Sequence, residues 1–197
     1  MTPPSTPAGP APMPVHASDL WKPVLLRALT ALMFGAVTVF WAAPGVSGMG
    51  WSGGIYLLLT GLALMWCTRT GGAGDQGPGR FLMFSAFFMA VYGLILPFLV
   101  TDSIFGVFAA FALGLVGLAE LYCAITMRGR HVLARDWIAS GVIGVGTAVV
   151  LPFFIGLGAH ALLGVAGGGA IISGVLWTLA ALTLRHDARS VSAEAVN

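Results

Sequence analysis

One carboxylate, Glu120, lies deep inside an apolar stretch of this 197-residue chain. An ionised carboxylate in such a stretch is costly, so Glu120 must be protonated, in contact with water, or paired with a cation. Arg128 follows eight residues later, and arginines elsewhere in the chain are also candidate partners. Two interpretations stay open: a proton-sensing or proton-carrying carboxylate, or a packed, hydrogen-bonded glutamate that fixes the fold.

Asp102 and His160 lie at short breaks between apolar stretches. In acid an aspartate tends to become neutral while a histidine becomes charged, given the pKa values of the free side chains. The two residues are therefore a candidate pH-responsive pair, and the alternative is that both are ordinary loop residues.

The sequence contains none of the common catalytic or cofactor signatures. It has no His-Glu-x-x-His and no phosphate-binding P-loop, and its single Gly-x-Ser-x-Gly match, from Gly50 to Gly54, lies at the start of an apolar segment and not at the strand-to-helix turn of an elbow. Cys67 and Cys123 both fall inside apolar runs, so we expect buried free thiols rather than a disulfide framework. Because an active site needs convergent titratable groups, we predict no catalytic residue, metal or cofactor, and no enzymatic activity.

The elements that position Glu120 follow from the composition. Hydrophobic residues make up 58% of the chain and charged residues 8%, against about 25% charged residues in a typical soluble domain. So few charges cannot cover the surface of a soluble globule, and the mean hydropathy of +0.94 agrees. The net charge of +2 is too small to indicate nucleic acid binding. We therefore expect a membrane protein.

Six segments are long and apolar enough to span a bilayer, which takes about 20 residues of helix. Helices are favoured because the backbone in lipid must bond to itself. Short turns and longer polar linkers alternate between the segments, which is typical of hairpins. We predict an all-α fold of six transmembrane helices in three hairpins, at about 21–69, 80–128 and 135–186. The segments are Val24 to Ala43, Trp51 to Thr68, Phe81 to Val100, Ile104 to Met127, Trp137 to Phe154, and Ala159 to Leu184.

All nine lysine and arginine residues fall on one side of this arrangement. Positive residues mark the cytoplasmic side, so we expect both termini in the cytoplasm and basic loops that attract anionic lipid head groups. Residues 1–20 are proline-rich and are predicted to be a disordered tail. The polar residues after Leu184 are also predicted to lack regular structure, with 187–197 as the C-terminal tail. The nine are Lys22, Arg27, Arg69, Arg80, Arg128, Arg130, Arg135, Arg185 and Arg189.

An arginine, a proline and a glycine recur at one spacing in all three hairpins. The proline follows the arginine by 17 residues, and the glycine follows the proline by 17. We expect the arginine at the membrane surface, within reach of lipid phosphates. We expect the proline near the outer end of its helix and the glycine at a close helix contact. Spacing leaves open a pseudo-threefold bundle or three hairpins in a row. The triples are Arg27, Pro44 and Gly61; Arg80, Pro97 and Gly114; and Arg135, Pro152 and Gly169.

Small residues four apart crowd the later segments, for example Gly106, Ala110 and Gly114, and then Gly164 and Gly168. Such spacing lets helices touch. It fits packing inside the chain, and it also fits a face for a homo-oligomer or another membrane protein.

The run from Arg27 to Gly35, followed by Phe40-Trp41-Ala-Ala-Pro44, resembles the first hairpin of the HdeD-type acid-resistance membrane proteins. The run Arg135-Asp136-Trp137, leading to Gly141, Gly144 and Pro152, is similar to the third hairpin of that family. The middle copy departs from the pattern, since Phe88 stands where the first copy has Gly35.

This resemblance covers about residues 21–186 and implies a three-hairpin protein of the bacterial inner membrane. The family is associated with survival of acid stress, so the resemblance implies a non-enzymatic role in acid or envelope stress resistance. It supplies no catalytic residues. The alternative from the residues themselves is a small transporter or channel for protons or a small solute. A channel needs a polar pathway, for which the sequence offers only Glu120 and scattered serine and threonine.

Overall fold

The computed structural model of the protein describes residues 19–194. This part is all-helical, and six helices are long and apolar enough to cross a membrane, one of them being α5 continued by η3. The predicted six-span fold is therefore confirmed, and the chain is a multi-pass membrane protein. The helices are α1 (Trp21–Phe40), α2 (Val46–Thr70), η2 (Ala73–Asp75), α3 (Gly77–Leu99), α4 (Asp102–Thr126), α5 (Ala134–Val150), η3 (Leu151–Leu157) and α6 (Ala159–Glu194).

The three repeat prolines lie near the helix ends where they were predicted. Pro44 follows the end of α1, Pro97 lies inside the last turn of α3, and Pro152 follows the end of α5. Pro44 and Pro152 lie beyond the ends of α1 and α5, whereas Pro97 lies inside α3 and has no N–H to donate to the carbonyl oxygen four residues earlier. At Pro152 the chain changes from the α-helical α5 to the 3-10 helix η3.

The C-terminal region differs from the prediction. Helix α6 continues past Leu184 to Glu194, so the interpretation of 187–194 as an unstructured tail is wrong. No glycine or proline occurs after Gly174, so nothing in this stretch breaks the helix. The predicted N-terminal tail, residues 1–20, lies outside the described residues except for its last two.

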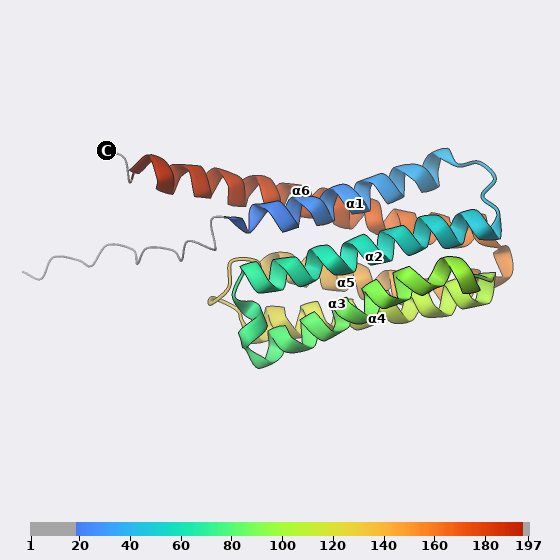
Figure 1. Cartoon of the computed structure of the whole chain (residues 1–197), viewed down its shortest axis with the longest axis horizontal. Helices are drawn as coiled ribbons and strands as arrows, with labels where there is room; N and C mark the ends of the chain where they lie inside the picture. Colours follow the sequence, from blue (N-terminus) through green and yellow to red (C-terminus); the bar gives the residue numbers. More distant parts are fainter. Residues whose placement is uncertain (1–18, 195–197) are drawn as a thin grey trace, which may run out of the picture.

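The six helices close into a ring. The most extensive contacts join α1 to α6, α2 to α3 and α4 to α5, and the two helices of each hairpin also touch. Figure 1 shows α1 and α6, the first and last helices of the chain, running side by side along the elongated bundle. This closure rules out three hairpins in an open row. Helices α2, α4 and α6 also touch one another, so they lie on the inside of the ring.

Glycines allow the closest helix contacts between hairpins. A methyl group on Gly61 of α2 would lie 2.6 Å from the Ala86 carbonyl oxygen of α3, and one on Gly117 of α4 would lie 2.9 Å from the Gly141 carbonyl oxygen of α5. Real side chains do not approach so closely, so the helices could not pack this way with larger residues.

The other two repeat glycines also lie at helix contacts, but not at equivalent ones. Gly114 of α4 faces Ala148 of α5, whereas Gly169 of α6 faces back to Thr147 of α5. The three hairpins are therefore not equivalent at the repeat glycine. Gly106 also packs within the chain, against Ile155 and Leu162, whereas Gly164 and Gly168 face open space.

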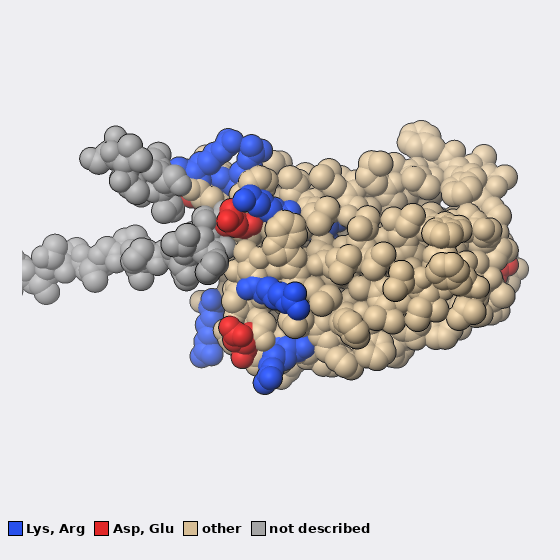
Figure 2. Space-filling model, in the orientation of Figure 1, with Lys and Arg blue, Asp and Glu red and all other residues tan. Residues whose placement is uncertain are grey.

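Charged side chains gather at one end of the bundle. Figure 2 shows the basic and most of the acidic side chains at that end and an uncharged surface over most of the remainder of this face. The chain begins α1, α3 and α5 there and ends α2, α4 and α6 there. All the basic residues at this end are exposed except Arg27, which is 7% exposed.

Candidate functional site

Glu120 and Arg27 form an ion pair inside the bundle. Glu120 on α4 is 1% exposed, and its Oε1 faces Nη1 of Arg27 on α1. The predicted candidate Arg128 is exposed at the charged end and makes no such contact. The prediction that Arg27 reaches lipid phosphates is wrong, because its side chain is turned into the protein.

The two partners meet because their helices place them at the same depth. Arg27 is the seventh residue of α1, and Glu120 lies six residues before the end of α4. Both distances correspond to about 9 Å along a helix from the charged end. The face of α1 that carries Arg27 also carries Val24, Ala28 and Ala31, all buried. That face packs into the bundle, so the arginine goes inward with it.

Two further side chains hold the Arg27 guanidinium in place. Its Nη2 donates a hydrogen bond to Ser140 Oγ of α5 at 3.2 Å. Trp177 of α6 donates from Nε1 to the same oxygen at 3.2 Å. The guanidinium carbon also lies 4.4 Å from the centre of the Trp177 ring, in a cation–π contact. Residues of four helices therefore converge on one buried charge pair.

A small cavity of about 30 Å³ lies against the pair. A cavity takes about 10–15 Å³ on this measure to hold a water molecule, so this one is large enough for water and too small for a solute. Its polar lining includes the hydroxyl of Thr60 on α2, which is buried and has no hydrogen-bond partner in the described part of the protein. The cavity is lined from all six helices, by Arg27, Ala31, Tyr56, Thr60, Met89, Leu113, Val116, Gly117, Glu120, Ser140, Gly144, Ser173 and Trp177.

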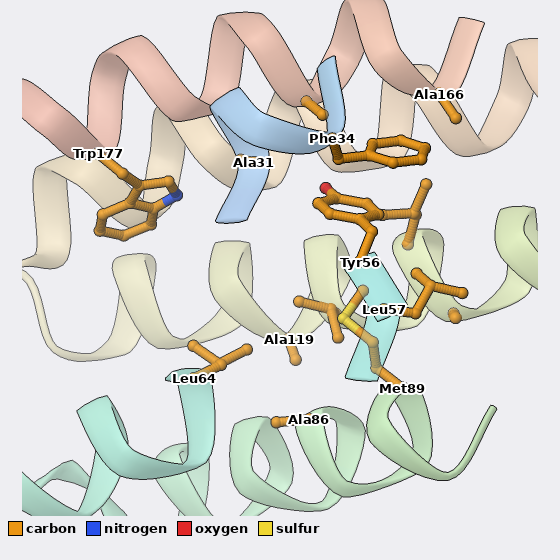
Figure 3. Close-up of a cluster of buried hydrophobic side chains, with 14 of the residues drawn as sticks. Ala31, Phe34, Tyr56, Leu57, Leu64, Ala86, Met89, Ala119, Ala166 and Trp177 are labelled. Atoms are coloured by element: carbon orange, nitrogen blue, oxygen red, sulfur yellow. The ribbon is translucent and has the colours of Figure 1, made fainter. Parts of the chain in front are cut away.

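Aromatic packing closes the cavity toward the uncharged end of the bundle. The rings of Phe34 on α1 and Tyr56 on α2 stack at 4.3 Å between centres, with 8° between their planes. Figure 3 shows the two rings face to face, with Trp177 on the other side of Ala31 and Leu64, Met89 and Ala119 below them. Of these, Ala31, Tyr56, Met89 and Trp177 line the cavity, so apolar and aromatic groups surround the polar centre.

The electrostatics of this centre are those of a desolvated ion pair. Taking both charges out of water is costly, and their mutual attraction offsets this cost only while both are present. Removing the negative charge by protonation would leave Arg27 buried without a counter-charge. The packing of the four helices around the pair therefore depends on both charges being present. Other ionisable groups near the pair are Tyr56 and Cys67 of α2, and Cys123 of α4 lies near Glu120.

Asp102 and His160, the candidate pH-responsive pair, are not brought together as a site. Asp102 opens α4 and one of its oxygens is buried without a partner, while His160 is exposed at the start of α6. No hydrogen bond or ion pair joins the two among the described residues. Their pH-responsive role stays a prediction.

The remaining predicted residues lie apart from this centre. Arg80 and Arg135 are exposed at the charged end. Cys67 and Cys123 are free and buried, as predicted. The described residues bring together no group of three His, Cys, Asp or Glu side chains that could hold a metal ion.

Sequence reasoning missed Ser140, Trp177 and the inward direction of Arg27. One signal was present for Arg27: it lies inside the predicted apolar span from Val24, whereas Arg80 and Arg135 come before theirs. Ser140 and Trp177 carry no such signal, since a serine and a tryptophan in a membrane helix are common.

No protein-family model, curated protein or solved structure matches this chain.

Proposed function

We propose that this chain is a non-enzymatic membrane protein of acid or envelope stress resistance, similar to the HdeD type, with Glu120 as its acid-responsive group. The observation that carries the proposal is the Arg27–Glu120 ion pair, buried where residues of all six helices meet. A charge change at this point acts on every helix. We further propose that the protein lies in the bacterial inner membrane with both termini in the cytoplasm, because its basic residues gather at one end.

The proposed sequence of events begins with acidification. Protonation of Glu120 removes the counter-charge of Arg27, and an uncompensated buried charge is strongly destabilising. The guanidinium is held by Ser140 and Trp177, so relief requires movement of α1 against α5 and α6. This movement would change how the six helices of the bundle pack against one another. A membrane protein partner or a second copy of the chain would sense that change, with membrane lipids as the surrounding medium.

The second candidate function is a proton pathway. The unpartnered Thr60 hydroxyl and a cavity with room for water beside Glu120 favour this alternative over transport of a solute. The stacked Phe34 and Tyr56 rings would then have to open to connect the cavity to the uncharged end.

Acid-shock survival tests the first proposal. A deletion strain is complemented with the wild-type chain, with Glu120→Gln, or with Asp187→Asn as the control, an exposed carboxylate at the charged end. The wild type and the control should restore survival, and Glu120→Gln should not, at equal amounts in the membrane. If deletion leaves survival unchanged, the stress-resistance proposal fails. Proton flux into vesicles containing the purified protein, compared with Glu120→Gln, tests the alternative.

A further inference from the structure

Two pockets at the charged end are lined by the same kinds of residue, namely two arginines and several apolar side chains. The first, the α2–α3 pocket, has a volume of about 500 Å³ and contains Arg69 from the end of α2 and Arg80 from the start of α3. The second, the α4–α5 pocket, has a volume of about 670 Å³ and contains Arg128 from the α4–α5 loop and Arg135 from the start of α5. Each pocket thus lies where one hairpin passes into the next and presents two arginines.

The four arginines have the charge to bind an anion. All four are exposed, and no ion pair engages them among the described residues. No acidic side chain lines either pocket in this part of the chain. Guanidinium groups bind phosphate oxygens with two parallel hydrogen bonds, so a pair of arginines suits a phosphate ester.

The other walls of the pockets are apolar and face outward. In the α2–α3 pocket the walls include Phe84 and Phe87, and in the α4–α5 pocket they include Val132 and Ile138; all four side chains are exposed. Phe84, Phe87 and Ile138 belong to membrane-spanning helices. A ligand with a phosphate at the arginines would therefore place its next atoms against apolar side chains at the bilayer surface, which is the geometry of a phospholipid.

The α4–α5 pocket is held in shape by its neighbours. His131 lines it, stacks on the buried Trp137 at 4.5 Å, and lies with Nε2 3.2 Å from the Gly71 carbonyl oxygen in the α2–α3 loop. Its Nδ1 accepts a hydrogen bond from the Leu133 backbone N–H, so Nε2 carries the proton and donates a hydrogen bond to the Gly71 carbonyl oxygen. The two interhairpin loops are thereby connected. The third junction, between α6 and α1, differs because its repeat arginine, Arg27, points to Glu120.

We propose that the α2–α3 and α4–α5 pockets each bind the phosphate-bearing head group of an anionic phospholipid, which joins neighbouring hairpins at the charged surface. The arginine pair supplies the phosphate contacts, and the exposed apolar walls receive the upper part of the acyl chains. This proposal needs only the membrane location of the chain and does not depend on a role in acid resistance.

Lipid binding to the full chain in a neutral detergent tests this directly, with native mass spectrometry as the readout. The probes are phosphatidylglycerol, phosphatidylcholine with the same acyl chains, and inorganic phosphate. The test variant is Arg80→Gln/Arg135→Gln, one arginine from each pocket. The matched control is Arg130→Gln/Arg189→Gln, which removes the same charge at exposed positions that line neither pocket.

The proposal expects the wild type to retain phosphatidylglycerol in preference to phosphatidylcholine. The test variant should bind it about fivefold more weakly at each pocket, from the contribution of one basic residue at an anionic surface, and the control should bind it as the wild type does. Equal weakening in both variants would mean a diffuse charge effect and would overturn the proposal. So would equal retention of phosphatidylcholine, or displacement of the lipid by an equal concentration of inorganic phosphate, which would indicate a site for a soluble anion.

Discussion

Arg27 and Glu120 are 93 residues apart in the sequence, on the first and fourth helices, yet they form a buried ion pair at the same depth in the bundle. The pair connects the first hairpin to the second. Through Ser140 and Trp177 it also contacts both helices of the third. The packing of all three hairpins therefore depends on one pair of opposite charges.

Breaking the pair from either side should destabilise the protein, and removing both charges should not. Glu120→Gln or Arg27→Gln is expected to cost about 3–5 kcal/mol, because each leaves one buried group without its partner. The double variant Arg27→Met/Glu120→Leu should recover most of that loss. Unfolding in mixed micelles gives the three values. A loss in the double variant equal to the sum of the two single losses would show that the residues act independently.

Ser140→Ala should weaken the site without removing a charge. The Ser140 hydroxyl accepts hydrogen bonds from both Arg27 and Trp177, so its loss leaves two buried donors unsatisfied at a cost of about 1–3 kcal/mol. The control is Ser52→Ala, whose hydroxyl bonds only to carbonyls of its own helix. The difference in the free energy of unfolding between the two variants is the measurement. No difference would mean that the hydrogen bonds to Ser140 do not contribute to the free energy of unfolding.

The contact between α4 and α5 should not tolerate a methyl group. Gly141→Ala would place its Cβ 2.7 Å from the Gly117 carbonyl oxygen, and overpacking of this kind costs about 1–3 kcal/mol. Gly146→Ala on the same helix points into open space and should be neutral or stabilise by up to about 1 kcal/mol. Thermal unfolding of both variants separates packing from helix propensity. A loss of similar size at Gly146 would contradict the packing explanation.

The junction between the interhairpin loops should weaken in mild acid. Burial lowers the pKa of His131 below its ordinary value of 6.5, and the hydrogen bond to Gly71 opposes this only in part. The folded state therefore holds His131 neutral where the unfolded chain already binds a proton. Stability from this group is complete above pH 6.5 and falls as the pH drops below that value toward the folded pKa.

Comparison with His131→Gln isolates this effect. The wild type should lose stability between neutral pH and about pH 5, and the variant should lose less over the same range. An identical pH profile for the two proteins would show that another group titrates. The Glu120 experiments should therefore be repeated in the His131→Gln background, so that the two acid responses are separated.

The architecture was predictable from the sequence to the extent that it depends on apolar length and charge placement. The six spans, the prolines at helix ends and the glycines at helix contacts all follow from local rules. Helix α6 ends ten residues later than predicted. The residues after Leu184 are polar, which favours the prediction of a disordered tail, but none of them breaks a helix.

The site was only half predictable, since its geometry depends on how each helix is rotated about its axis. Glu120 was identified because a carboxylate in an apolar span needs a partner. Arg27 occupies the same repeat position as Arg80 and Arg135, but it is the seventh residue of α1, whereas Arg80 is the fourth residue of α3 and Arg135 the second of α5. A difference of three to five residues therefore separates the buried arginine from the two exposed ones. The pairing of Arg27 with Glu120 depends on how α1 and α4 are arranged in space. The spacing of residues along the sequence does not show that arrangement.

The most direct test of the central claim is an infrared titration of the purified protein in lipid, from neutral pH to about pH 4, where carboxyl groups titrate. We predict that acidification produces a carboxylic acid band in the wild type that Glu120→Gln lacks, together with an amide change that the variant also lacks. A wild-type spectrum identical to that of Glu120→Gln would contradict the account, because acid would then act on the protein through some other group.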